Sequence, residues 1–246
     1  MAEKPGMNNP QLAQIWVYLA ASPLFGLTIT LAAYQLAHHV YVRSGRNQLL
    51  NPVVTAVVLL IILLQLTGMP YQDYFAGAQF VHFLLGPATV ALAIPLYRQF
   101  AKLRQLWLPV LTALVLGVSI GGLSAVLIAD MLGADTRTLL SLAPKSVTAP
   151  VAMGIAERLG GLPSLTAVLV VSTGVIGAVF GTRLFDWMGI RDDSVRGIAM
   201  GVAAHGIGTA RAFQVSSEMG AFSGLAMALS AFLASVILPW LVRWVQ

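Results

Sequence analysis

The chain has 246 residues, of which 58% are hydrophobic and only 9% are charged, with a formal net charge of +5 and no Cys. A soluble domain carries about 25% charged residues, so the composition argues against a water-soluble enzyme, a disordered protein and a disulfide scaffold. The basic residues stand in small groups between long apolar runs, which is typical of membrane loops and not of the basic patch of a nucleic-acid-binding protein. We therefore predict an all-α polytopic membrane protein that has no catalytic residues and no nucleic-acid partner.

Six stretches lack charged residues over about the 20 residues that a membrane-spanning helix needs. They lie near residues 15–40, 50–68, 80–97, 106–128, 163–182 and 221–242. Asn51 and Pro52 open the second stretch. The sequence thus predicts about six full transmembrane helices in the lipid bilayer.

Two further apolar segments, 136–160 and 196–220, are each interrupted in the middle by Pro or Gly and by a cation. Such broken segments are tolerated in a membrane only where protein buries them or where they line a wet cavity. Each is followed at once by a full span, which defines two related units at about 136–182 and 196–242. Paired interruptions in two repeats point to a transporter's binding site. We expect an inverted-repeat, elevator-like arrangement, with a scaffold at 1–130 and a transport region at 131–246.

Lys and Arg counts bear on whether the broken segments cross the membrane or re-enter it. With two re-entrant hairpins, eight of these residues lie on one side and four on the other, Lys145 and Arg211 left aside. With two full crossings the division is six to six. The positive-inside rule favours the hairpins, and full crossing stays the alternative.

The first break contains Lys145, Ser146 and Thr148 between Pro144 and Pro150. Proline removes a backbone donor and disfavours helix at the residue before it, so an open chain is expected here. The following half-helix would point its N-terminus at the break, which favours an anion. Lys145 and the two hydroxyls are candidate substrate-binding residues. The alternative is that Lys145 extends from a short loop to the membrane interface.

The second break contains His205, Gly206, Gly208, Thr209 and Arg211. The glycines permit positive φ and close approach of the backbone, and Arg211 offers a fork that matches a carboxylate. Two opposed breaks, each with a Thr and a cation, would form a pocket suited to a small monocarboxylate. His205 would contact substrate, relay a proton or only pack within the protein.

Three other polar residues, Glu157, Glu218 and Asn51, have either a proton-coupling or a structural role. Either glutamate would also pair with Arg211 in a purely structural arrangement. We expect no metal site and no cofactor, because the sequence has no cluster of His or Cys and no phosphate-binding loop.

Several motifs resemble the LrgB family, which includes CidB and YohK. They include Lys-Ser-Val-Thr and His-Gly-Ile-Gly-Thr-Ala-Arg, and they lie at 49–52, 85–97, 142–150, 201–211 and 218–225. The resemblance runs from about residue 15 to the C-terminus. It implies a multi-pass protein of a bacterial inner membrane that works beside a small LrgA- or CidA-like membrane protein, and we expect a homo-oligomer, a dimer.

The resemblance implies two different functions. Bacterial members are named holin-like or antiholin-like and are linked with murein hydrolase export and cell lysis. The plastid member is similar to an LrgA–LrgB fusion and is a glycolate/glycerate translocator, and bacterial pairs are tied to pyruvate uptake. A lytic pore needs no opposed broken segments bearing Lys145 and Arg211. We therefore favour a secondary carrier for small monocarboxylates over the holin-like alternative.

Overall fold

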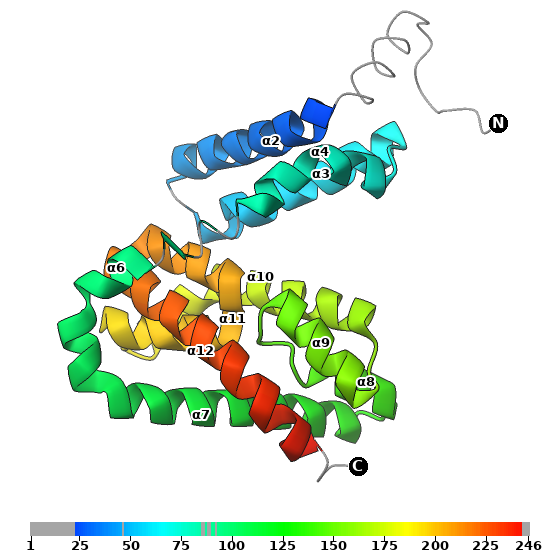
Figure 1. Cartoon of the computed structure of the whole chain (residues 1–246). Helices are drawn as coiled ribbons and strands as arrows, with labels where there is room; N and C mark the ends of the chain where they lie inside the picture. The colour runs from blue at the N-terminus through cyan, green and yellow to red at the C-terminus, as the bar shows by residue number, and fades with distance from the viewer. Residues whose placement is uncertain (1–22, 46, 85–86, 88–89, 92, 243–246) are drawn as a thin grey trace, which may run out of the picture. The chain divides into compact units, whose positions relative to one another are not determined.

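The computed structural model describes residues 23–45, 47–84, 87, 90–91 and 93–242, and all regular elements in these residues are helices. Its helices fall into two compact units, whose boundary in the chain lies between Val90 and Ala91 (Figure 1). The predicted boundary at residue 130 separates a scaffold from a moving transport region. Compact units do not test which parts move, so this boundary stays a prediction.

The first unit is built around α2, Pro23–Arg43, which packs on both α3, Pro52–Thr67, and α4, Tyr71–Phe83. A short 3-10 helix, Gln48–Leu50, precedes α3. The Asn51 side chain is buried and caps α3, since its Oδ1 accepts from the N–H of Val53 at 3.0 Å. Asn51 therefore serves here as a helix cap.

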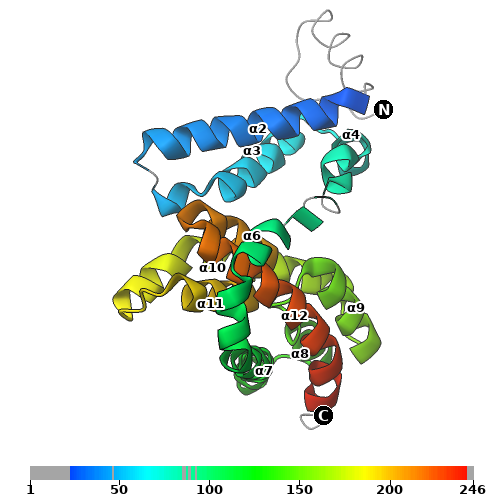
Figure 2. The same cartoon turned by 60° about the vertical axis from the view of Figure 1, so that its left-hand side comes forward.

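The second unit contains seven helices among the described residues, and α12 is central to it. This helix packs on α6, α7, α9 and α11, and α10 lies against α9 and α11 (Figures 1 and 2). The bounds are α6 Ala93–Arg98, α7 Phe100–Met131, α8 Thr136–Leu142, α9 Ala149–Leu159, α10 Pro163–Trp187, α11 Asp193–Val215 and α12 Ser217–Val242.

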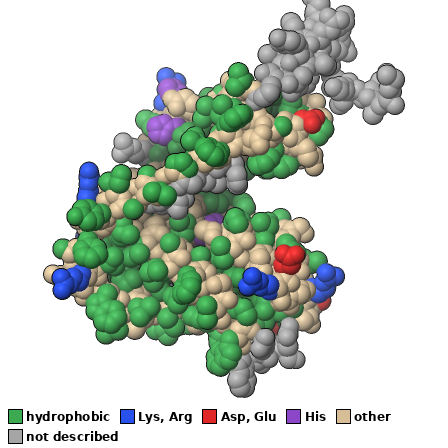
Figure 3. Space-filling model, in the orientation of Figure 1, with side chains coloured by type: hydrophobic (Ala, Val, Ile, Leu, Met, Phe, Trp, Pro, Cys, Tyr) green, Lys and Arg blue, Asp and Glu red, His purple; other side chains and the backbone are tan. Residues whose placement is uncertain are grey.

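Three of the predicted spans are confirmed, because α7, α10 and α12 are long and apolar enough to cross a membrane. Each leaves most of its apolar stretch unburied by protein, and hydrophobic side chains are spread over the visible surfaces of the units (Figure 3). Such surfaces suit lipid contact. The structure thus supports a polytopic membrane protein.

Among the described residues, only these three helices meet both the length and the hydropathy of a span, so the number of six full spans stays a prediction. The stretch 80–97 is not one helix, because α4 ends at Phe83 and α6 begins at Ala93. Its two prolines, Pro87 and Pro95, each remove a backbone donor. The stretch 50–68 forms only the 16 residues of α3, and 15–22 lies outside the described residues.

The predicted interruptions of both broken segments are confirmed. In the first, α8 ends at Leu142 and α9 starts at Ala149, with tight turns between. In the second, His205 takes φ 40° and ψ −134° within α11. The expectation that Gly206 or Gly208 supplies the positive φ is wrong, since His205 does so.

Glu218 also differs from its predicted place late in the second segment. That segment ends at Val215, the extended residue Ser216 follows, and Glu218 lies in the first turn of α12. The hydroxyl of Ser216 accepts from the N–H of Met219, so it stops one helix and caps the next.

Candidate functional site

A cavity of about 690 Å³ lies between α7 and α11 in the second unit. Residues spaced three or four apart on α7 form one wall, which places them on one face of that helix. These wall residues are Leu106, Pro109, Val110, Ala113, Gly117, Ile120 and Gly121. One face of the first half of α11 forms the other wall, with Ser194, Val195, Ile198, Ala199, Val202 and Ala203.

Lys145 and Ser146 of the first break line the same cavity, as does Thr173 of α10. The Nζ of Lys145 donates to the backbone oxygen of Gly121 and to the Ser146 hydroxyl, both at 3.5 Å. Among the described residues, no carboxylate forms an ion pair with Lys145. The cavity therefore contains one ammonium group whose charge has no counter-ion among the residues that the structure describes.

Small residues of α7 let the first break lie close to that helix. A Cβ on Gly122 would come within 2.5 Å of Leu238 Cδ2 and 3.4 Å of the Ala143 oxygen, and Gly121 faces the Ser146 hydroxyl. A side chain at Gly122 would therefore collide with Leu238 of α12 unless Leu238 moved. The first break itself lies in ordinary contact with Gly121, whose oxygen accepts from Lys145 Nζ.

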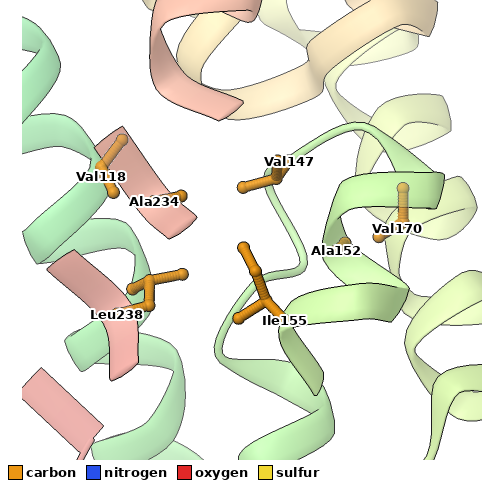
Figure 4. Packing of buried hydrophobic residues seen from close by; sticks show 7 residues of the cluster. All are labelled: Val118, Val147, Ala152, Ile155, Val170, Ala234 and Leu238. Atoms are coloured by element: carbon orange, nitrogen blue, oxygen red, sulfur yellow. The ribbon is translucent and has the colours of Figure 1, made fainter. Parts of the chain in front are cut away.

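An apolar cluster holds the first break from its other side. Val147 is buried with Ile155 of α9, Val118 of α7 and Leu238 of α12, and Val170 of α10 completes the contact with α9 (Figure 4). Ser146 and Val147 therefore have opposite surroundings, one in the cavity and the next in the core.

The second break reverses the direction of the chain. A Cβ on Gly208 would lie 2.5 Å from Ala204 Cβ and 3.1 Å from the Met200 oxygen. In a straight helix, residues eight apart are separated by about 12 Å along the axis. The two halves of α11 are therefore folded against each other, as a hairpin around His205.

The His205 side chain is buried and fixed against α10. Its Nε2 lies 2.9 Å from the Val170 oxygen, and because a carbonyl only accepts, Nε2 carries the hydrogen. A Cβ on Gly174 would come within 2.8 Å of the ring, so Gly174 provides the notch that holds it. Val170 also belongs to the apolar cluster that contains Val147 and residues of α9, so both broken segments reach the same turn of α10.

The other predicted residues of the second break lie away from the cavity lining. Thr209 Oγ1 donates to the His205 oxygen at 2.8 Å and shares a 2.9 Å hydrogen bond with Ser223 of α12. Arg211 is buried, and its Nη1 donates to Gln214 Oε1 at 3.0 Å. Gly206 is exposed, and Gly208 is buried in the hairpin contact.

The structure therefore brings Lys145 and Ser146 together in the cavity, but it does not place Arg211, Thr209 or His205 in the same wall. Thr148 caps α9 by position and does not line the cavity either. The cavity face of α11 lies before the break. Its residues are aliphatic or small, a pattern that the sequence cannot distinguish from an ordinary packing face.

Charged residues gather at the start of α7, beside the first residues of α11 and α12. Lys102 Nζ lies 2.6 Å from Glu218 Oε1 and 3.4 Å from Asp192 Oδ2. The sequence did not indicate Lys102 as the partner of Glu218. Glu157, the other candidate, is exposed in the last turn of α9.

Asp192 also caps α11, since its Oδ1 accepts from the N–H groups of Ser194 and Val195. The hydrogen bonds from the Ser194 hydroxyl and from Val195, with the charge of Lys102, lower the pKa of the Asp192 carboxyl to about 2. Asp135 caps α8 in the same way, and its hydrogen bonds from Thr138 lower its pKa as well. In the part of the chain that the structure describes, no group of three His, Cys, Asp or Glu could hold a metal ion.

The family profile and the similar proteins all indicate the same family. The profile of the LrgB-like family matches residues 30–244. The chain is 37% identical to the uncharacterized protein YxaC of Bacillus subtilis, over 89% of this chain and 94% of that protein. It is 32% identical to the holin-like protein CidB of Staphylococcus epidermidis, over 92% of this chain and 97% of that protein. It is 29% identical to the antiholin-like protein LrgB of Bacillus cereus, over 91% of this chain and 97% of that protein. No solved structure matches the chain.

Proposed function

The chain belongs to the LrgB-like family of multi-pass membrane proteins, and from the geometry of its cavity we propose that it is a secondary carrier for small monocarboxylates. The observation that carries the proposal is Lys145, an ammonium group that lines a large, mostly apolar cavity without a carboxylate partner among the described residues. A charge at membrane depth is costly. A substrate carboxylate would offset that cost by supplying the missing counter-ion.

In this proposal, Lys145 Nζ binds the carboxylate by charge-assisted hydrogen bonds. The Ser146 hydroxyl lies within 3.5 Å of Nζ, so it can donate to the same carboxylate or bond to a 2-hydroxy or 2-oxo group. A single cation suits a single negative charge. Glycolate, glycerate and pyruvate are therefore the first substrates to test.

The cavity also suggests how the carrier would move. One wall, α7, lies in the predicted scaffold region, and the other, α11, lies in the predicted transport region. Sliding of the two hairpins along α7 would carry Lys145 past the small residues Gly117 and Gly121 and expose it to each side in turn. This is an elevator-like form of alternating access.

The names of two relatives favour a second candidate function. CidB is called holin-like and LrgB antiholin-like, and this chain would then control murein hydrolase export and lysis in a bacterial inner membrane. Such a protein would oligomerise, alone or with a small LrgA- or CidA-like partner. It would pass solutes without choosing among them.

Uptake by proteoliposomes separates the two candidates. We expect saturable uptake of radiolabelled glycolate or pyruvate, lost in Lys145→Ala and retained in Arg158→Ala. Arg158 is the matched control, because it is an exposed cation of the same broken segment outside the cavity. Release of a trapped dye that is equally fast in wild type and Lys145→Ala, with no selective uptake, would support the holin-like candidate. The same assay with the small partner added tests whether that partner is required.

A further inference from the structure

The cavity is much longer than a two- or three-carbon acid requires. Its α7 wall runs from Leu106 to Gly121, which corresponds to about 22 Å along the helix. Its volume of about 690 Å³ lies in the range of ligand pockets, about 300 to 1,000 Å³, and one side is open, since the lining residues Ala113 and Ile120 are exposed. A small hydroxy acid bound at Lys145 would contact only one end of this space.

Polar groups are unevenly distributed along the cavity. Lys145 and Ser146 lie next to Gly121, at one end of the α7 wall. At the other end, the hydroxyl of Ser194 is already engaged with Asp192. Thr173 is similarly engaged, since its hydroxyl donates to the Leu169 oxygen at 2.8 Å.

Between the ends, both walls are apolar. Pro109, Val110 and Ala113 face the cavity from α7, and Ile198, Ala199 and Val202 face it from α11. Apolar walls bind water poorly, and an apolar chain placed there gains from its removal from water. The cavity therefore combines a charged end with an apolar slot, which is the complement of an amphipathic anion.

We propose that the cavity binds a monocarboxylate with an unbranched aliphatic tail. The carboxylate lies at Lys145 and Ser146, and the tail extends between α7 and α11 toward Leu106. This inference rests on the proposed function in one respect only, that carboxylates bind at Lys145. It adds that the tail, and not a 2-hydroxy group, supplies most of the affinity.

A series of straight-chain acids tests the proposal on the purified full-length protein in lipid nanodiscs. Acetate, butyrate, hexanoate and octanoate each compete with radiolabelled octanoate. We expect the affinity to rise by about fourfold for each added methylene group, until the slot is filled. Octanol has the same tail without the charge, and we expect it to compete far more weakly.

Variants separate the slot from non-specific partition into lipid. Ala113→Leu places a larger side chain in the slot and should weaken octanoate binding more than acetate binding. Ala228→Leu is the same substitution on an exposed position of α12 outside the cavity, and it should bind like wild type. Lys145→Ala should lower the affinity for every acid of the series.

Two negative outcomes differ in what they overturn. If acids bind in a Lys145-dependent way but with equal affinity along the series, the aliphatic slot is wrong and the carrier proposal stands. If no acid binds in a Lys145-dependent way, both proposals are wrong. Equal competition by octanol and octanoate would also overturn the inference, because the charged end would then have no role.

Discussion

The two broken segments have the same order of structural features along the chain, but the side chains at their breaks have different surroundings. Each starts at an Asp cap, reverses its course within the second unit and contacts Val170 of α10. In the first, a six-residue stretch without helix turns Lys145 toward a cavity. In the second, the reversal takes one residue, His205, whose ring is hydrogen-bonded and buried. One break therefore presents a polar group to the cavity, and the other is packed and hydrogen-bonded within the protein.

The largest expected effect tests whether the second break is as tightly packed as this comparison requires. Gly208→Ala places a methyl group 2.5 Å from Ala204 Cβ, so overpacking should destabilise the protein by about 1 to 3 kcal/mol. Gly206→Ala, two residues away, meets only the Met227 sulfur at 3.8 Å and should be neutral. Thermal unfolding of the two detergent-solubilised variants measures the difference. Equal stabilities would mean that the α11 hairpin is not folded as described.

A smaller effect is expected where α12 is tied to α7. Lys102 and Glu218 form a close ion pair, but their side chains are 36% and 31% exposed. Pairs of this kind contribute about 0.2 to 1 kcal/mol. A double-mutant cycle with Lys102→Met and Glu218→Gln should give a coupling energy in that range. A coupling energy of zero would show that the pair does not hold α7 to α12.

The smallest effect at neutral pH concerns the two Asp caps, and it grows only in acid. The folded-state pKa of Asp192 is about 2, below the ordinary value of 3.8. Its contribution to stability is therefore complete above about pH 4 and is lost as the pH falls toward 2. Asp192→Asn keeps a good cap but loses the charge that faces Lys102, so it should be slightly less stable at pH 7 and should lose part of this acid sensitivity. Identical acid unfolding curves for wild type and Asp192→Asn would contradict this assignment.

Sequence patterns could predict the interruptions and the long spans, because Pro, Gly and charge act locally in a membrane. Pro144 and Pro150 mark the first break, and the apolar runs of α7, α10 and α12 are unmistakable in length. The sequence could not show that Lys145 faces the part of α11 that precedes His205, or that Arg211 lies outside the cavity lining. Both facts depend on how the α11 hairpin folds back. His205 illustrates the limit: a neighbouring Gly was expected to take the positive φ, yet the His ring fits the notch at Gly174 and fixes its own backbone.

The central claim is that the charge of Lys145 binds the transported carboxylate, and a chemical replacement of that charge tests it most directly. The chain has no Cys, so Lys145→Cys introduces a single thiol into the cavity. We expect this variant to lose carboxylate uptake in proteoliposomes, and aminoethylation of the thiol, which restores an ammonium group of nearly the same reach, to recover it. A neutral reagent of similar size should not restore uptake. Uptake that is unaffected by Lys145→Cys, or that stays absent after complete aminoethylation of a folded protein, would contradict the account.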